Sequence, residues 1–79
     1  MSTNAIIQWL SGHFGMKESR DYYDRGNKTF HRVQWENGDS YEHEEIYQDR
    51  DHKRTITRIN GHIVADKNLE WIPYKWAAI

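Results

Sequence analysis

The chain has 79 residues, a formal charge of −1 at pH 7 and no cysteine. Without cysteine it can form no disulfide, no thiolate metal site and no catalytic thiol. No apolar run approaches the ~18 residues that cross a membrane, and the first residues lack the basic and apolar regions of a secretory signal. We therefore expect a cytoplasmic protein without membrane association.

The apolar content is low for a folded domain. Leu, Ile, Val and Phe make up 14 of the 79 residues, close to the range of disordered chains, but disorder also requires high net charge and few aromatics. Four Trp and five Tyr supply large side chains that can be buried at low entropic cost. The sequence predicts a single small α+β domain over residues 1–79, with a short N-terminal helix packed on a four- to five-stranded antiparallel β-meander.

A helix is predicted over residues 1–16. Polar residues 2–4 can cap its first turn, and Gly12 or Gly15 can end it. The side chains at the spacing of one helical face are Ile6, Trp9, Leu10, His13 and Phe14. Because a helix this short is marginal alone, its apolar face is expected to dock on the sheet.

Residues 17–28 are charged around a Tyr22-Tyr23 pair and predict a loop or an edge strand. One interpretation is that one tyrosine packs inward while the arginines pair with nearby aspartates. The alternative is a sheet that binds single-stranded nucleic acid by stacking bases on aromatic rings. The residues for that alternative are Arg20, Tyr22, Tyr23, Arg25, Arg54 and Arg58. A pI near 6.5 argues against it, because dedicated nucleic-acid binders of this size are usually basic.

Residues 29–48 predict an acidic, aromatic β-hairpin. A three-residue turn with Gly38 in the left-handed conformation favours one register. That register pairs Trp35 with Asp39, Val33 with Tyr41, Arg32 with Glu42, and His31 with His43. A two-residue turn at Asn37-Gly38 would set Val33 against Glu42 and mix apolar with charged side chains, so we favour the three-residue turn.

Residues 54–72 predict a second hairpin and a last strand. Asn60-Gly61 between β-branched runs is a strong hairpin signal. A further turn is expected at residues 66–68, followed by a strand over residues 69–72 that Pro73 stops. The apolar tail at residues 73–79 is expected to cover the core or to dock on a partner, for example in a homodimer.

The main functional hypothesis is a non-enzymatic module that binds a protein with a basic surface. Seven of the eight charged residues between positions 36 and 51 are acidic, and Trp and Tyr beside them are residue types that anchor interfaces. The expected partner-binding residues are Trp35, Glu36, Asp39, Tyr41, Glu42, Glu44, Glu45, Tyr47, Asp49 and Asp51. Small size and the lack of catalytic motifs favour a stand-alone inhibitor or regulator of the kind that phages encode. The alternative is that these charges only keep the protein soluble by preventing edge strands from pairing with those of other molecules.

A third hypothesis is a small metal-dependent or acid–base hydrolase. His31, His43 and Glu45 would share one face of the hairpin and could supply three ligands or an acid–base pair. No nucleophile elbow, phosphate loop or HExxH motif accompanies them. We therefore expect no enzyme activity and no cofactor.

Overall fold

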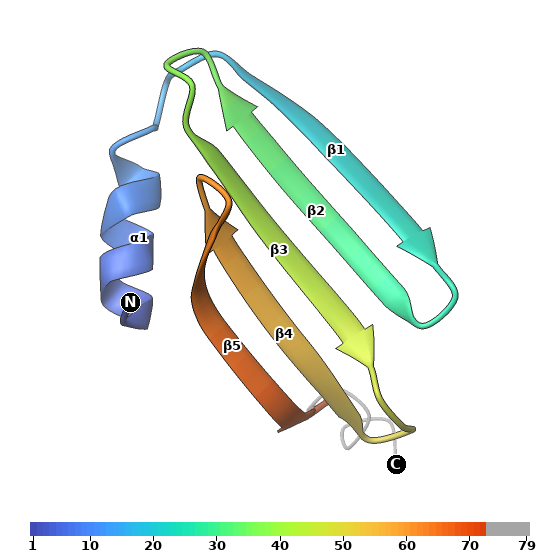
Figure 1. Cartoon of the computed structure of the whole chain (residues 1–79). Helices are drawn as coiled ribbons and strands as arrows, with labels where there is room; N and C mark the ends of the chain where they lie inside the picture. The colour runs from blue at the N-terminus through green and yellow to red at the C-terminus, as the bar shows by residue number, and fades with distance from the viewer. Residues whose placement is uncertain (73–79) are drawn as a thin grey trace.

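Five antiparallel strands follow one short helix in residues 1–72, the part of the chain that the structure, a computed structural model, describes (Figure 1). In chain order the elements are α1 (Thr3–Ser11), β1 (Glu18–Arg25), β2 (Lys28–Trp35), β3 (Ser40–Tyr47), β4 (His52–Ile59) and β5 (His62–Trp71). Sequence neighbours pair, so the sheet order is β1-β2-β3-β4-β5. The predicted α+β class with an antiparallel sheet is confirmed. The predicted apolar tail at residues 73–79 lies outside the described residues.

The hairpin of β2 and β3 has the predicted register. Val33 lies opposite Tyr41, and the neighbouring predicted pairs are also present. The Trp35 N–H donates to the Asp39 carbonyl at 2.9 Å, and the Gly38 N–H donates to the Trp35 carbonyl at 3.0 Å. Gly38 has φ of 93°, a left-handed value that costs glycine little. The three-residue turn is therefore confirmed.

Two further turns agree with the sequence. Of the predicted segment 17–28, residues Glu18–Arg25 form the edge strand β1, which reverses into β2 at Gly26-Asn27. The turn between β4 and β5 is Asn60-Gly61, where both residues have positive φ, 52° and 83°. Positive φ at both central positions matches the twist of an antiparallel hairpin.

The turn predicted at residues 66–68 is wrong, because β5 continues through it. Thr55 pairs with Lys67 while Lys53 pairs with Glu70, so β5 carries one extra residue between these pairs. The extra residue forms a bulge, which disrupts the ladder locally without reversing the chain. Leu69 has φ of 53°, and its N–H donates to the Gln48 side chain at 3.1 Å. The side chain of Gln48 thus partners a backbone donor at the bulge.

The helix is shorter than predicted. Ser2 caps it by accepting from the Ala5 N–H at 3.1 Å, and Gly12 follows its last turn. Because the helix ends before His13, the predicted apolar face stops at Leu10, and Phe14 is 96% exposed. Placing Phe14 on that face was therefore wrong. Among residues 1–72, no helix has the length and apolarity to span a membrane.

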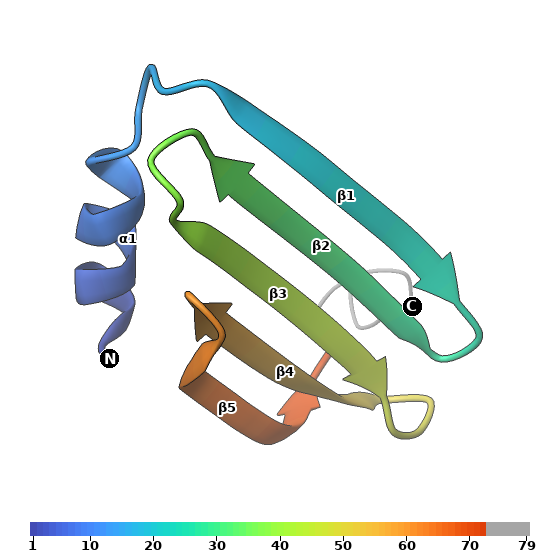
Figure 2. The same ribbon diagram turned by 45° about the horizontal axis from the view of Figure 1, so that its top comes forward.

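The two views in Figures 1 and 2 place α1 beside the end of the sheet that carries the β2–β3 and β4–β5 turns. We call the sheet face that bears Val33, Trp35 and Tyr41 the helix-side face, and the opposite one the far face. Trp9 of α1 meets Trp35 edge to face, with ring centroids 5.5 Å apart. The Met1 amino group donates to the Val64 carbonyl at 2.9 Å. No residue of α1 is buried, so the predicted packing of the helix is present only in part.

The interior is small and lies mostly on the helix-side face. Val33 is 3% exposed, Ile59 8% and Trp35 9%. Ile56, on the far face opposite Glu44, is 5% exposed. Few side chains therefore exclude water, and the aromatic residues carry much of the packing.

Candidate functional site

The seven predicted carboxylates do not form one acidic ladder. Glu44 and Glu45 are adjacent in a strand, so their side chains point to opposite faces. Five of the seven pair with basic side chains: Asp39 with His13, Glu42 with Arg58, Glu44 with Lys28, Glu45 with Lys53, and Asp49 with His52. Glu36 and Asp51 form no ion pair with any described residue. Most of the negative charge of the hairpin is therefore balanced within the molecule.

The aromatic residues predicted at the same surface also have internal roles. Trp35 is 9% exposed. Tyr41 is half-buried, and this burial raises its pKa because it disfavours the phenolate. The Tyr47 hydroxyl donates to Glu45 Oε2 at 3.3 Å. These side chains stabilise the helix-side face and present little ring surface to a partner.

A cluster around His13 closes the contact between α1 and the sheet. The His13 ring lies 4.3 Å from the ring centroids of both Trp9 and Trp35. Its Nδ1 is 2.8 Å from the Trp9 carbonyl oxygen, and its Nε2 is 2.7 Å from Asp39 Oδ2. We call Trp9, His13, Trp35 and Asp39 the Trp–His cluster. It joins the residue after the helix to the turn between β2 and β3.

The geometry of this cluster favours the protonated form of His13. A carbonyl and a carboxylate only accept hydrogen bonds, so both contacts are hydrogen bonds only when both ring nitrogens carry protons. The hydrogen bond to Asp39 raises the pKa of His13, and the carbonyl of Trp9 acts in the same direction. The hydrogen bonds from His13 and Asn60 lower the pKa of Asp39. When His13 is protonated, the cluster is an imidazolium–carboxylate pair whose cation packs against two indoles that also contact each other, and cation–π attraction favours such a contact.

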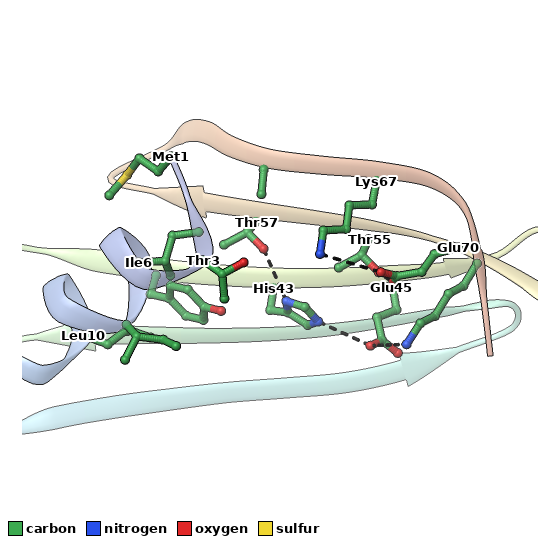
Figure 3. A pocket seen from close by; sticks show the side chains of 14 residues that line it. Met1, Thr3, Ile6, Leu10, His43, Glu45, Thr55, Thr57, Lys67 and Glu70 are labelled. Atoms are coloured by element: carbon green, nitrogen blue, oxygen red, sulfur yellow. Dashed lines mark hydrogen bonds and ion pairs between the residues drawn. The ribbon is translucent and has the colours of Figure 1, made fainter. Parts of the chain in front are cut away.

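A pocket of about 380 Å³ lies between α1 and the strands β3 to β5 (Figure 3). Ile6 and Leu10 of the helix line its apolar end. His43 lies at its centre, and Lys67 and Glu70 of β5 stand at its polar end. Such a mixture of apolar wall and polar groups is common in small-molecule sites.

The polar groups in this pocket bind one another. Glu45 Oε1 is 3.0 Å from Lys53 Nζ and 3.3 Å from His43 Nε2. Burial alone would raise the pKa of Glu45, but the hydrogen bonds from Lys53 and His43 outweigh it and leave that pKa lowered. The Thr57 hydroxyl is 3.5 Å from His43 Nδ1. In the tautomer with its proton on Nε2, the His43 ring can accept from Thr57 and donate to Glu45.

The three residues predicted for a metal do not converge. His31 and His43 lie opposite each other across β2 and β3. The Nε2 of His31, however, lies 3.2 Å from the guanidinium of Arg20, where it accepts a hydrogen bond. Among residues 1–72, no three His, Asp or Glu side chains are arranged to hold an ion.

The residues predicted for nucleic acid are also divided. Arg54 pairs with Asp66 at 2.7 Å, and this raises the pKa of Arg54. Arg58 lies 3.7 Å from Glu42. The other four residues alternate along β1, so Arg20 and Tyr22 project to one face and Tyr23 and Arg25 to the other. The structure gives no continuous surface that combines all six.

The outer edge of β1 is an open surface of the sheet. All eight residues of this strand are exposed, and it pairs only with β2. Tyr22 is 67% exposed and Tyr23 45%, so neither tyrosine packs inward. Both faces of β1 are therefore exposed, and one of its two edges has no neighbouring strand.

Hydrogen bonds to neighbouring strands show which groups of β1 face outward. The Tyr47 N–H donates to the Asn27 carbonyl, so odd positions of β2 bond to β3. The Glu36 N–H donates to the Lys17 carbonyl, so even-numbered residues of β2 form hydrogen bonds with odd-numbered residues of β1. The N–H and carbonyl groups at positions 18, 20, 22 and 24 therefore point away from the sheet.

The sequence carries signals for part of the β1 edge and of the Trp–His cluster. The alternation of β1 predicts two exposed faces once the strand is placed at the edge. His13 lies four residues after Trp9, the spacing at which its ring can reach the Trp9 carbonyl, but Asp39 is identified only by the fold. Comparisons with protein-family models, curated proteins and solved structures find no match to this chain. Any functional conclusion therefore rests on its own geometry.

Proposed function

We propose that this chain is a small non-enzymatic module that binds another protein by adding an extended segment to the open edge of β1. The carrying observation is the eight-residue strand, exposed along its whole length, with a row of backbone groups directed outward. Extended peptides bind such edges through backbone hydrogen bonds, and pockets or side chains beside the edge supply selectivity.

The side chains beside this edge favour a protein partner. Tyr22 and Tyr23 offer aromatic rings on the two faces, and tyrosine is frequent in interface anchors. Tyr23 stacks on Phe30 with ring centroids 5.1 Å apart, which holds it in place on the far face. Asp21, Asp24 and Arg25 form no ion pair with any described residue and remain available to a partner. This proposal keeps the protein-binding function and moves its centre from the acidic hairpin to the neighbouring edge strand.

The test uses peptide binders selected from a displayed library of random eight-residue sequences. Tyr22→Pro removes an outward N–H that the sheet does not use, so the fold should survive, as edge strands tolerate proline there. The control Tyr22→Thr keeps the N–H and changes only the side chain. Selected peptides should lose at least tenfold in affinity for the proline variant and less for the threonine variant. Equal affinity for wild type and Tyr22→Pro, with unchanged circular dichroism, refutes strand addition.

A second candidate, acid–base hydrolysis, is favoured by the chain of contacts from Thr57 through His43 to Glu45 inside the pocket. A base oriented by a carboxylate can activate water. Thr57 itself is 6% exposed, so water is the more accessible nucleophile. The test compares His43→Gln with the exposed control His62→Gln on chromogenic ester and phosphate substrates. Turnover lost only in His43→Gln would favour this candidate, and no turnover by wild type excludes it for these substrates.

A further inference from the structure

We propose that the outer edge of β1 also binds a second copy of this chain, in an antiparallel pairing that joins two sheets across a twofold axis at Tyr22. This inference rests on the proposed strand addition and names one partner for it. The outward groups at positions 18, 20, 22 and 24 would bond to the same groups of the partner. In a twofold dimer, the paired residues of an isologous interface are related by symmetry.

The outward groups restrict the register to a few choices. Only even-numbered residues of β1 have outward hydrogen-bonding groups, so every hydrogen-bonded pair across the interface joins two even-numbered residues. The twofold axis must therefore pass between one residue and the same residue of the partner subunit. With the axis at Asp21, Asp21 would face its copy, and Glu18 would face Asp24 of the partner subunit. Like charges directly opposite are unfavourable. With the axis at Arg20, two guanidinium groups would meet, so both registers are disfavoured.

The axis at Tyr22 avoids these conflicts. It pairs Arg20 of each copy with Asp24 of the partner subunit, so opposite charges meet twice. Tyr22 meets its own copy, which adds an aromatic pair. Seven residues, from 19 to 25, then align without a like-charge pair. The axis at Tyr23 also avoids like charges, by pairing Asp21 with Arg25 of the partner subunit, but only five residues align before the turn at Gly26.

The charges needed for the favoured register are free or nearly free in the single chain. Asp24 forms no ion pair with residues 1–72. Arg20 donates to Glu18 and to His31 through three N–H groups, and a guanidinium has five. The cation can therefore bind a second carboxylate without leaving the first.

The interface is small, so the dimer should be weak. A pairing of seven residues along one edge falls below the ~1,000 Å² of a stable interface. We therefore expect a monomer in dilute solution and a dimer at concentrations of about 0.1 to 1 mM, most populated at low ionic strength because the two charge pairs are screened by salt.

Sedimentation equilibrium between about 10 μM and 1 mM tests the proposal with a charge exchange. Arg20→Asp and Asp24→Arg each set like charges opposite one another twice, so each should weaken dimerisation about tenfold. The double variant Arg20→Asp/Asp24→Arg restores opposite charges and should recover wild-type association. The single variants Asp21→Arg and Arg25→Asp set like charges opposite one another only in the register with its axis at Tyr23, so with the axis at Tyr22 they should leave association unchanged. Circular dichroism checks that every variant folds.

Recovery in the double variant Arg20→Asp/Asp24→Arg, with association unchanged in Asp21→Arg and Arg25→Asp, supports the Tyr22 axis. Three results overturn it: a wild-type chain that is monomeric at 1 mM, a dimer that Arg20→Asp and Asp24→Arg leave unchanged, or a dimer that is weakened by Asp21→Arg and Arg25→Asp. The proposed function is judged separately, because Tyr22→Pro can lose peptide binding even if wild type never dimerises. Conversely, a charge-sensitive dimer without peptide binding would support self-association and refute the broader recognition role.

Discussion

Replacing Trp9 with alanine should destabilise the protein more than any other alanine substitution in α1. Trp9 is the only residue of α1 whose ring contacts both His13 and Trp35 among the described residues. Truncating a fully buried Trp costs about 3 to 5 kcal/mol. Because the Trp9 side chain is only partly buried, roughly half of that applies, about 2 kcal/mol. The edge-to-face contact with Trp35 contributes about 0.5 to 1.5 kcal/mol of such a loss.

This loss is large for a domain of 79 residues, whose free energy of unfolding is expected at about 4 to 12 kcal/mol. With about 4 to 8 °C per kcal/mol at this size, Tm should fall by roughly 8 to 16 °C. Thermal unfolding followed by far-UV circular dichroism measures it. The control is Gln8→Ala, an exposed neighbour on the same helix, which should change Tm by less than about 3 °C. If Trp9→Ala and Gln8→Ala shift Tm equally, the Trp–His cluster does not anchor the helix.

Four further predictions concern pH, backbone conformation and helix capping. The pKa of His13 is raised in the folded state. Its contribution to stability is therefore complete below about pH 6.5 and is lost as pH rises through the folded pKa. The variant His13→Gln should flatten that part of a curve of Tm against pH. The pKa of Asp39 is lowered, so its contribution is lost only as pH falls through that lowered value in an acid titration. Gly38→Ala should cost about 1 to 2 kcal/mol in urea unfolding, because φ is 93° there, whereas Gly12→Ala, with φ of −65°, should cost much less. Ser2→Ala removes the helix cap and should cost about 1 kcal/mol in the same assay.

Much of the fold followed from turn chemistry and alternation. Gly38 and Asn60-Gly61 fixed two hairpins, because the left-handed conformation at these positions is cheap for glycine and tolerable for asparagine. The same kind of signal failed at residues 66–68. There the polar residues form part of a bulged strand, because β4 is long enough to keep pairing beyond them. A local pattern does not reveal the length of the strand that lies opposite.

The charged residues were harder to interpret. A run of carboxylates in one hairpin looks like an acidic surface when the partner strands are unknown. The register of β3 against β4 sets Glu42 beside Arg58, and the neighbouring Lys53 reaches Glu45. That register depends on the turn at residues 48–51, where the aspartates predict a turn but no Asn-Gly or Asp-Gly pair defines its length. An edge strand was one of the two predictions for residues 17–28, but only the order of all five strands shows that its outer edge stays open.

The strand order has a consequence for how the molecule opens. Because every strand pairs only with its neighbours in sequence, the contacts within the described sheet are local, and proteins of this kind fold quickly for their size. β1 is held by a single hairpin and has no second neighbour, so it can separate from β2 while the other four strands remain paired. Hydrogen exchange should show the odd-numbered amides of β1 exchanging through this partial opening, well before those of β3 and β4. If the edge of β1 binds a partner as proposed, it can adapt to that partner by local unfolding, at a cost confined to one strand.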